Sequence, residues 1–416
     1  MSAPASSVAE AGYRGLWKNR RFRYYFASSV AGETGYSVFT IAVLLLAYET
    51  SGSLFVTAAV LFVEFGIYAL SFLAGPFVDR VANLRTVFVL GYPVQAALAI
   101  TIGLLAYDGR LSVPLLLVLV AGISLAWNFT WTVTNAVPPH ILSTEELFLA
   151  NGLTNAFSAG STLIGYAAGA SLIIVFPTYG TAAGALLYGV LNLAAAALIL
   201  PVSVPMVGRA VESLRASFVR GWRYFLAGTS RPLLQLSIFS AAQALFSAAP
   251  PLLITFLAHT VFPDPNQSYA LLFTVYGAGE MVGSLVVGRL NPRRHLWAWL
   301  AGVSVAEGLF ILLAVLAAPV LWASALGWFA VGVVDITFYM GVIVFFQATT
   351  PAAMLGRTLT NTYVFRGGTR AAGALIVGVL AGVLVPGALG VLIAIVFIGV
   401  GLLGPLALPA VRSVRF

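Results

Sequence analysis

The sequence predicts an all-α membrane protein with about twelve spanning helices. Hydrophobic residue types make up 60% of the 416 residues and charged types only 8%, whereas a soluble domain has about 25% charged residues. A chain of this composition has too few polar side chains to face water on all sides. Because one helical span needs about 20 apolar residues, the length accommodates about twelve spans, and no stretch is long and polar enough for a separate soluble domain.

Long apolar runs bounded by charged residues, Pro or Gly give the positions of the helices. The first six are expected at residues 22–48, 54–78, 86–106, 114–137, 151–176 and 180–200. The last six are expected at residues 233–258, 269–290, 297–317, 320–347, 358–384 and 388–408. Pro250 and Pro251 lie inside the seventh run and predict a kink or break there. The chain is thus divided into a six-helix half at 1–200, a link at 201–232 and a second six-helix half at 233–416.

The basic residues lie beside alternate helix ends. They gather before the first helix, in the connections after the second, sixth, eighth and tenth, and after the twelfth, while the opposite side has only Arg110. The positive-inside rule then places both termini in the cytoplasm, with the chain in the inner or plasma membrane of the cell. In the link, Leu214, Phe218, Trp222 and Phe225 recur at helical spacing between arginines, which favours an amphipathic helix on the inner membrane surface over a solvated helical linker.

The sequence lacks the patterns that a cofactor, a metal or nucleic acid would require. It has no Gly-Lys-Ser/Thr phosphate-binding loop, so neither direct use of ATP nor a cofactor is expected. His140, His259 and His295 fall in separate connections without the spacing of zinc ligands, so no metal site is expected. The net charge of +8 lies largely beside helix ends, where it orients the chain, so no nucleic-acid partner is expected.

Charged side chains near the middles of the expected spans are the main candidates for function. A charge at the bilayer centre costs at least about 2.5–3.5 kcal/mol on the insertion scale, so such residues usually face a cavity or a partner. They are Glu33, Glu64, Glu280, Glu307, Asp335, Arg366 and Arg370. The two arginines are four residues apart and share one helix face, with Asp335 and Glu280 as expected counter-ions. Because a poorly hydrated cavity disfavours a charged carboxylate, these acids could exchange protons with solvent as proton coupling requires. For each residue the alternative is a structural charge that ties helices together.

One loop motif resembles a known signature. The stretch from Gly75 through Asp79 and Arg80 to Ala82 resembles G-x-x-x-D-R-x-G-R-R, the loop signature of the major facilitator superfamily, and matches its first Gly, its Asp and its first Arg. A degenerate copy without the Asp lies at 288–294, at the equivalent place in the second half. The resemblance implies a major facilitator fold, in which Gly75, Asp79 and Arg80 form a conformational gate that makes and breaks contact with the opposite half.

Further stretches resemble one branch of that superfamily, which holds the enterobactin exporter and macrolide efflux proteins. They are Asn-Arg-Arg-Phe-Arg-Tyr at 19–24, Tyr-Glu-Thr-Ser-Gly-Ser at 48–53, Gly-Trp-Arg-Tyr-Phe-Leu at 221–226 and Thr-Pro-Ala-Ala-Met-Leu-Gly-Arg at 350–357. The branch implies export. However, Tyr166 stands where antiporters of the superfamily have a Pro in the motif of helix 5, which leaves import open.

In the superfamily, the first and fourth helices of each half line a central cavity. Polar side chains at helical spacing fall on those four helices here. They are Ser29, Glu33, Tyr36, Ser37 and Thr40 on helix 1, Ser124, Asn128, Trp131, Thr132 and Asn135 on helix 4 (with Trp127 beside them), Ser240, Gln243 and Ser247 on helix 7, and Asp335 and Tyr339 on helix 10. Hydrogen bonds between helices are the alternative explanation for these stripes.

The leading hypothesis is therefore a monomeric secondary transporter, in the lipid bilayer, that exports small amphipathic organic molecules in exchange for protons. An importer or facilitator on the same fold is the first alternative. A membrane-embedded lipid enzyme would need a catalytic cluster at one membrane face, for which Glu145 and Glu146 near His140 are the available residues. A receptor that binds a ligand without transporting it is the last alternative.

Overall fold

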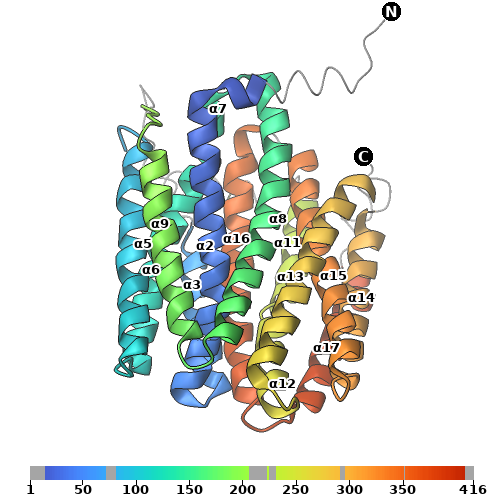
Figure 1. Cartoon of the computed structure of the whole chain (residues 1–416). Helices are drawn as coiled ribbons and strands as arrows, with labels where there is room; N and C mark the ends of the chain where they lie inside the picture. The colour runs from blue at the N-terminus through green and yellow to red at the C-terminus, as the bar shows by residue number, and fades with distance from the viewer. Residues whose placement is uncertain are drawn as a thin grey trace, which may run out of the picture.

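The computed structural model describes residues 15–71, 81–205, 223, 231–290, 296–350 and 352–407 (Figure 1). Its first half contains α2 (Arg20–Ser51), α3 (Leu54–Ala69), α5 (Arg85–Tyr107), α6 (Val113–Ala136), α7 (Pro138–Ile141), α8 (Thr144–Val175) and α9 (Gly180–Ile199). Its second half contains α11 (Arg231–Ala244), α12 (Ala249–Thr260), α13 (Pro265–Leu290), α14 (Leu296–Leu316), α15 (Leu321–Thr349), α16 (Ala352–Leu380) and α17 (Pro386–Ala407).

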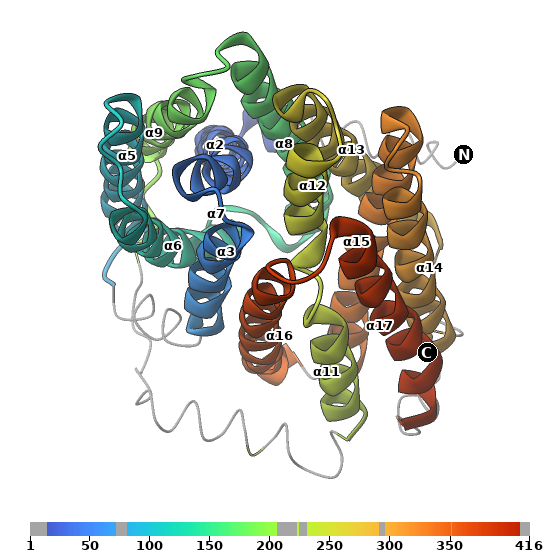
Figure 2. The same ribbon diagram turned by 90° about the horizontal axis from the view of Figure 1, so that it is seen from below.

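Ten segments of the described residues are long and apolar enough to cross a membrane, with α11 and α12 together forming one of them. The shorter apolar helix α3 and the 29-residue helix α16 complete the twelve helices expected from the sequence. Figure 2 shows the helices of the first half on one side of the molecule and those of the second half on the other. Below, the upper end is the end of the bundle at α7 and the lower end is the end at α12, as drawn in Figure 1.

Two local predictions about helix boundaries can be compared with the structure. The seventh helix is broken between α11 and α12, immediately before Pro250 and Pro251, as the two prolines predicted. The fifth helix was expected from residue 151, but α8 begins at Thr144. Its start is fixed by a capping box, in which the Ser143 hydroxyl accepts the Glu146 N–H and the Glu146 carboxylate accepts the Ser143 N–H. The acidic pair therefore belongs to the first turn of the helix and not to a connecting loop.

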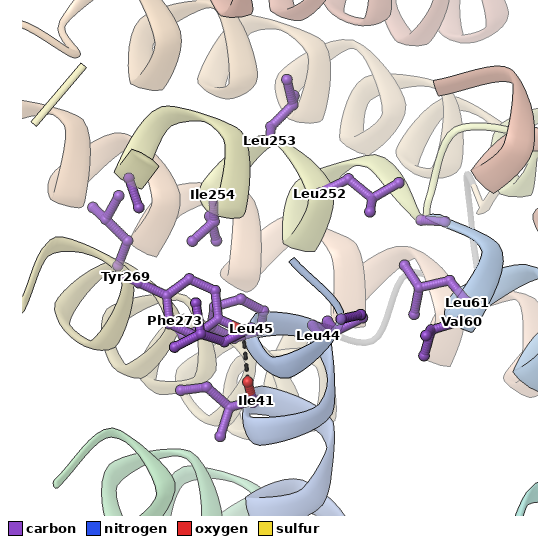
Figure 3. Close-up of a cluster of buried hydrophobic side chains, with 14 of the residues drawn as sticks. Ile41, Leu44, Leu45, Val60, Leu61, Leu252, Leu253, Ile254, Tyr269 and Phe273 are labelled. Carbon is purple, nitrogen blue, oxygen red and sulfur yellow. Dashed lines mark hydrogen bonds between the residues drawn. The ribbon is translucent and has the colours of Figure 1, made fainter. Parts of the chain in front are cut away.

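Buried apolar side chains form one cluster that joins the two halves and two clusters that do not. The joint cluster occupies the lower part of the bundle, where Leu44 and Leu45 of α2 and Leu61 of α3 lie near Leu252 of α12 and Phe273 of α13 (Figure 3). At the upper end, a second cluster contains only first-half residues and a third only second-half residues. Among the described residues, apolar packing therefore seals the lower end between the halves and leaves the upper ends of the halves separately packed.

A hydrogen bond and a close backbone contact add to this arrangement. The Tyr269 hydroxyl of α13 donates to the Ile41 carbonyl oxygen of α2 at 2.7 Å, within the joint cluster (Figure 3). In the second half, Gly373 of α16 lies directly against the Leu245 carbonyl group, in the break between α11 and α12. A side chain at Gly373 would overlap that carbonyl, so the glycine allows α16 to pack on exposed backbone of the broken helix.

Candidate functional site

A cavity of about 270 Å³ lies between the two halves. From the first half it is lined by Tyr36, Glu64, Phe65, Tyr68, Ser124, Trp127 and Asn128, and from the second half by Ser247, Glu280, Asp335, Ile336, Tyr339, Tyr363, Arg366, Gly367 and Arg370. We call it the first cavity. It is bordered by α2, α3 and α6 on one side and by α13, α15, α16 and the break after α11 on the other.

A second cavity, of about 330 Å³, adjoins the first and is bordered by α2, α3 and α8 of the first half and α12, α13, α15 and α16 of the second. The two cavities share part of their lining, which consists of Tyr36, Glu64, Phe65, Glu280, Ile336 and Arg370. Three of these shared residues are charged, and they come from both halves. Three of the five charged residues that line the two cavities therefore lie where the cavities meet.

The carboxylates of the first cavity are hydrogen-bonded by tyrosines. The Tyr36 hydroxyl of α2 donates to Glu64 of α3, and the Tyr276 hydroxyl of α13 donates to Asp335 of α15 at 2.7 Å. Glu280 lies one helical turn after Tyr276 and interacts with the same phenol. Neutral donors of this kind can bond a carboxyl group whether or not it carries a proton, so each acid keeps a partner through a change of protonation.

The two arginines bond the broken seventh helix. Arg366 donates from Nη1 to the Ser240 carbonyl oxygen at 3.2 Å and to the Ser240 hydroxyl, while Arg370 donates from Nη2 to the Ser247 carbonyl oxygen at 3.3 Å. The Arg370 guanidinium also lies 4.0 Å from the centre of the Phe65 ring, across the interface between the halves. The prediction that Asp335 and Glu280 are counter-ions holds only at longer range: both interact electrostatically with these guanidiniums, but the hydrogen bonds go to oxygens of Ser240 and Ser247.

Aromatic rings cover the first-half wall and the upper side of the first cavity. Tyr36 and Trp127 stack with centroids 4.2 Å apart and planes 9° apart. One turn nearer the upper end, Tyr68 of α3, Trp131 of α6 and Tyr363 of α16 contact one another pairwise, with centroid distances of 5.7–6.0 Å. We call these three residues the aromatic triangle. It joins the two halves above the cavity, whereas the joint apolar cluster joins them below.

Of the two α6 residues predicted to line the pathway, Asn128 lines the first cavity, whereas Trp131 lines neither cavity and borders the small space that contains Glu33. The Nδ2 of Asn128 donates to the Ile67 carbonyl oxygen of α3 at 3.1 Å. Trp131 belongs to the aromatic triangle. Thr132 and Asn135, which share their stripe, instead bond carbonyl oxygens of their own helix, at Asn128 and Trp131. The polar stripe of helix 4 is therefore divided between the cavity and hydrogen bonds within α6.

Glu33 is separated from the central space, contrary to the expectation that it shares a cavity with Tyr36. It lines a small space of about 10 Å³ together with Ser29, Tyr92, Trp127, Thr130, Trp131 and Thr134. Of these, Trp127 also lines the first cavity, so its indole ring forms part of the partition between the two spaces. A volume of this size holds about one water molecule.

Gln243 and Glu307, both candidates for the pathway, line neither cavity. Glu307 of α14 is fully buried, and its carboxylate accepts a hydrogen bond from Gln243 Nε2 of α11 at 2.9 Å. The pair ties α14 to α11 behind the Ser240 contact of Arg366. Spacing along a helix identified both residues as polar, but the side of the helix that faces the cavity depends on how neighbouring helices are arranged.

Several residues that line the cavities were not among the sequence candidates. They are Phe65 and Tyr68 on α3, Tyr276 on α13 and Tyr363 on α16. Each lies within one turn of a charged residue on its own helix, at Glu64, Glu280 or Arg366. Aromatic residues at that spacing from an intramembrane charge are the signal that could have found them. Gly75, Asp79, Arg80 and the amphipathic segment of the link lie outside the described residues.

No protein-family model matches the sequence, and no curated protein is found to match it. Solved structures do match. A mutant of the nucleoside transporter NupG superposes with a TM-score of 0.75 at 11% identity, covering 95% of this chain and 100% of that one. A bacterial homologue of the iron transporter ferroportin, in its inward-facing state, gives a TM-score of 0.69 at 17% identity, covering 96% and 100%. A POT family transporter in complex with 5-aminolevulinic acid gives 0.74 at 11% identity, covering 96% and 97%.

The chain shares the fold of these solved structures. Its twelve helices in two six-helix halves are the major facilitator fold that the sequence predicted, and the match extends over almost the whole length of each neighbour. In this fold, the two cavities lie between the halves. They adjoin the helix pairs α3–α16 and α8–α13, which pack against each other across the interface.

Proposed function

We propose that this chain is a secondary active transporter that works by alternating access and exports small amphipathic organic molecules in exchange for protons. The observation that carries the proposal is the charged cavity between the two halves. Its walls come from both halves, so a rocking motion of one half against the other would change which end the cavity faces. The similarity of fold to the nucleoside, iron and POT family transporters supports transport as the general activity.

The character of the cavity lining supports an amphipathic substrate. Ring faces at Tyr36, Trp127, Phe65 and Tyr339 offer apolar area, and the acids and guanidiniums offer charged contacts. Volumes of about 270 and about 330 Å³ correspond to the lower end of the size of small-molecule sites, which is about 300–1,000 Å³. The substrate in this conformation is therefore a compact molecule with an aromatic or aliphatic body.

Buried carboxyl groups support protons as the coupling ion. Glu64, Glu280 and Asp335 face the first cavity, and at least two of them bond tyrosine hydroxyls rather than guanidiniums. Glu33 has a space of its own beside Trp127. Carboxyl groups in such surroundings can load and release protons during a transport cycle, and we assign this role to Asp335 and Glu33 as well as to the acids of the shared lining.

The distribution of basic residues supports cytoplasmic termini, so we propose that the upper end faces the cytoplasm of a cell with this chain in its inner or plasma membrane. The joint apolar cluster would then close the outer side. Asp79 and Arg80, with Gly75, are the proposed gate at the cytoplasmic rim. The stretches that resemble the enterobactin exporter and macrolide efflux branch support export, and we expect the chain to act as a monomer.

The lipid-enzyme alternative depended on acidic residues near His140 that would be available for chemistry. The Glu146 carboxylate is instead engaged in the capping box at the start of α8. Transport therefore remains the function that the geometry supports best.

Reconstituted vesicles test the proposal. Purified chain is placed in proteoliposomes with an imposed pH gradient, and the movement of a fluorescent amphipathic dye is followed together with internal pH. We expect the dye and protons to move in opposite directions. Asp335→Asn and Glu33→Gln should each reduce the coupled flux by about 100-fold or more, because one positioned proton-transfer group contributes about 10²–10⁴-fold. Glu49→Gln is the matched control, because Glu49 bonds Thr181 near the lower end of α2, away from both cavities.

Three results would contradict parts of the proposal. Coupled flux that is unchanged in both acidic variants would remove the assigned proton sites. Dye and protons moving in the same direction would indicate an importer. Binding of the dye without any gradient-driven movement would indicate a receptor.

A further inference from the structure

The place where the two cavities meet holds one guanidinium and two carboxylates. Arg370 of α16 interacts electrostatically with Glu64 of α3, in the first half, and with Glu280 of α13, in the second half. All three residues line both cavities. Arg370 donates a hydrogen bond to the Ser247 carbonyl oxygen, and its buried Nε has no hydrogen-bond partner. One cation is therefore shared by acids from opposite halves and is fixed to neither.

The other charged groups near this cluster do not supply the positive charge that its second carboxylate lacks. Asp335 of α15 interacts with Arg366 of α16 and accepts the hydrogen bond of Tyr276. Glu307 of α14 lies outside both cavity linings but also interacts with Arg366 and Arg370, so it adds to the excess of acids. The remaining neighbours are neutral phenols: Tyr36 from α2, Tyr166 from α8 and Tyr276 from α13. The lining of the first cavity thus holds three carboxylates and two guanidiniums. If Arg366 balances Asp335, Arg370 can balance only one of Glu64 and Glu280.

The acid that Arg370 does not balance requires a positive charge from elsewhere. An unpaired carboxylate in a water-poor interior is strongly disfavoured, and it is relieved either by a proton or by a cation that binds beside it. A proton and a singly charged ammonium group are equivalent in this charge balance. Phe65, Tyr36 and Trp127 line the first cavity together with Glu64, and the Phe65 ring already contacts one cation, the Arg370 guanidinium. This aromatic lining suits both a cation and an apolar body.

We propose that Glu64 and Glu280, which share Arg370, form the site that binds the ammonium group of an organic amine in exchange for one proton. The proton leaves the carboxylic acid for bulk water as the ammonium group takes its place, so the charge of the cavity does not change. The apolar body of the amine packs on the rings of the first-half wall. The inference rests on the proposed transport function and names its substrate class: compact organic amines that carry one positive charge.

Matched pairs of ligands test the substrate class directly in binding. The probes are primary amines with naphthyl, biphenyl and phenyl groups and the neutral alcohols with the same carbon skeletons. Isothermal titration calorimetry of the purified full chain, in two buffers with different heats of ionisation, gives both the affinity and the number of protons released. We expect each amine to bind about tenfold or more tightly than its alcohol, which is the preference of a charge-assisted contact over a neutral one. We also expect about one proton to be released for each amine and none for the alcohols, because the ammonium charge replaces that of the proton.

Substitutions give a pattern that follows from the charge count. Glu64→Gln and Glu280→Gln each remove the unbalanced acid, so each is expected to abolish proton release and reduce the preference for amines to about twofold or less. Arg370→Gln leaves both acids without a guanidinium and is expected to keep the preference and the proton release. Glu64→Asp restores a carboxyl group that is one methylene shorter, and it is expected to recover the proton release that Glu64→Gln loses. Glu49→Gln, outside the cavities, is the matched control.

The inference fails if amines bind no more tightly than their alcohols on all three skeletons, or if none of the probes binds. It also fails if Glu64→Gln and Glu280→Gln both release a proton as the native chain does. Thermal unfolding of each variant shows whether it is folded, and proton release by Glu64→Asp separates loss of the carboxyl group from damage to the fold. The proposed function is tested separately by the dye and pH measurement in vesicles. If dye and protons move in a coupled way in vesicles but amine binding releases no proton in calorimetry, this inference is wrong and the proposed function stands.

Discussion

Replacing Gly373 by alanine should lower the stability of the second half. We expect a larger loss than from a methyl group added at any other position of α16 in the region that lines the cavity. A Cβ at this position would lie well inside 3.4 Å, where ordinary contact begins, and the atom it meets is the Leu245 carbonyl oxygen. That carbonyl is part of the backbone at the break between α11 and α12, so no side-chain rotation relieves the overlap. Overpacking of a well-packed interior costs about 1–3 kcal/mol, and a backbone neighbour puts Gly373→Ala at the upper end of that range.

Gly368→Ala is the matched control, because it adds the same methyl group to the same helix where nothing lies within 4 Å. Alanine favours a helix over glycine by up to about 1 kcal/mol, so Gly368→Ala should leave stability unchanged or raise it. The two variants are compared by thermal unfolding of purified protein in one detergent. A lower transition temperature for Gly373→Ala and a native or higher one for Gly368→Ala is the expected result. Equal stability of Gly373→Ala and Gly368→Ala would show that α16 does not pack against the Leu245 carbonyl group at the break between α11 and α12.

Two further predictions use a cysteine introduced at the cavity-lining residue Ser247 in a chain that has no cysteine of its own. Tyr269→Phe removes the hydrogen bond to the Ile41 carbonyl oxygen at the lower end, worth about 0.5–1.5 kcal/mol, so labelling of the Ser247→Cys thiol from the lower side should become faster. Tyr363→Ala removes two ring contacts of the aromatic triangle, each worth about 0.5–1.5 kcal/mol, so labelling from the upper side should become about fivefold faster or more. Each variant should leave access from the other side close to native, and a uniform increase on both sides would point to general loosening rather than to an effect at one end.

The positions of the helices could be predicted from the sequence because apolar length and boundary residues act locally. Pro250 and Pro251 fixed the break in the seventh helix for the same reason, since proline removes a backbone donor wherever the chain goes. The early start of α8 also has a local signal, because Ser143 and Glu146 have the spacing of a capping box, whereas the apolar run that predicted this helix begins only at residue 151.

The candidate site was less predictable because it depends on how helices face one another. Glu64 and Glu307 looked alike in the sequence, as single acids in apolar runs. In the structure Glu64 lines both cavities, and Glu307 is fully buried against Gln243 behind them. Which side of an intramembrane helix faces the cavity is set by long-range packing, and spacing within one helix carries no information about it. The same argument explains why Tyr68 and Tyr363 were not found.

The joint apolar cluster at the lower end also sets a condition on the whole transport cycle. Opening that end would separate side chains such as Leu44, Leu252 and Phe273, and each large apolar side chain brought from a buried to an exposed position costs about 1.5–3 kcal/mol. The opposite state can be populated only if a comparable area is covered elsewhere, and the separately packed clusters at the upper end are the surfaces available for it. The relative stability of the apolar contacts at the two ends thus decides which end is closed at rest. A mutation far from the cavity can therefore change the resting state of the chain without altering the binding of substrate or protons.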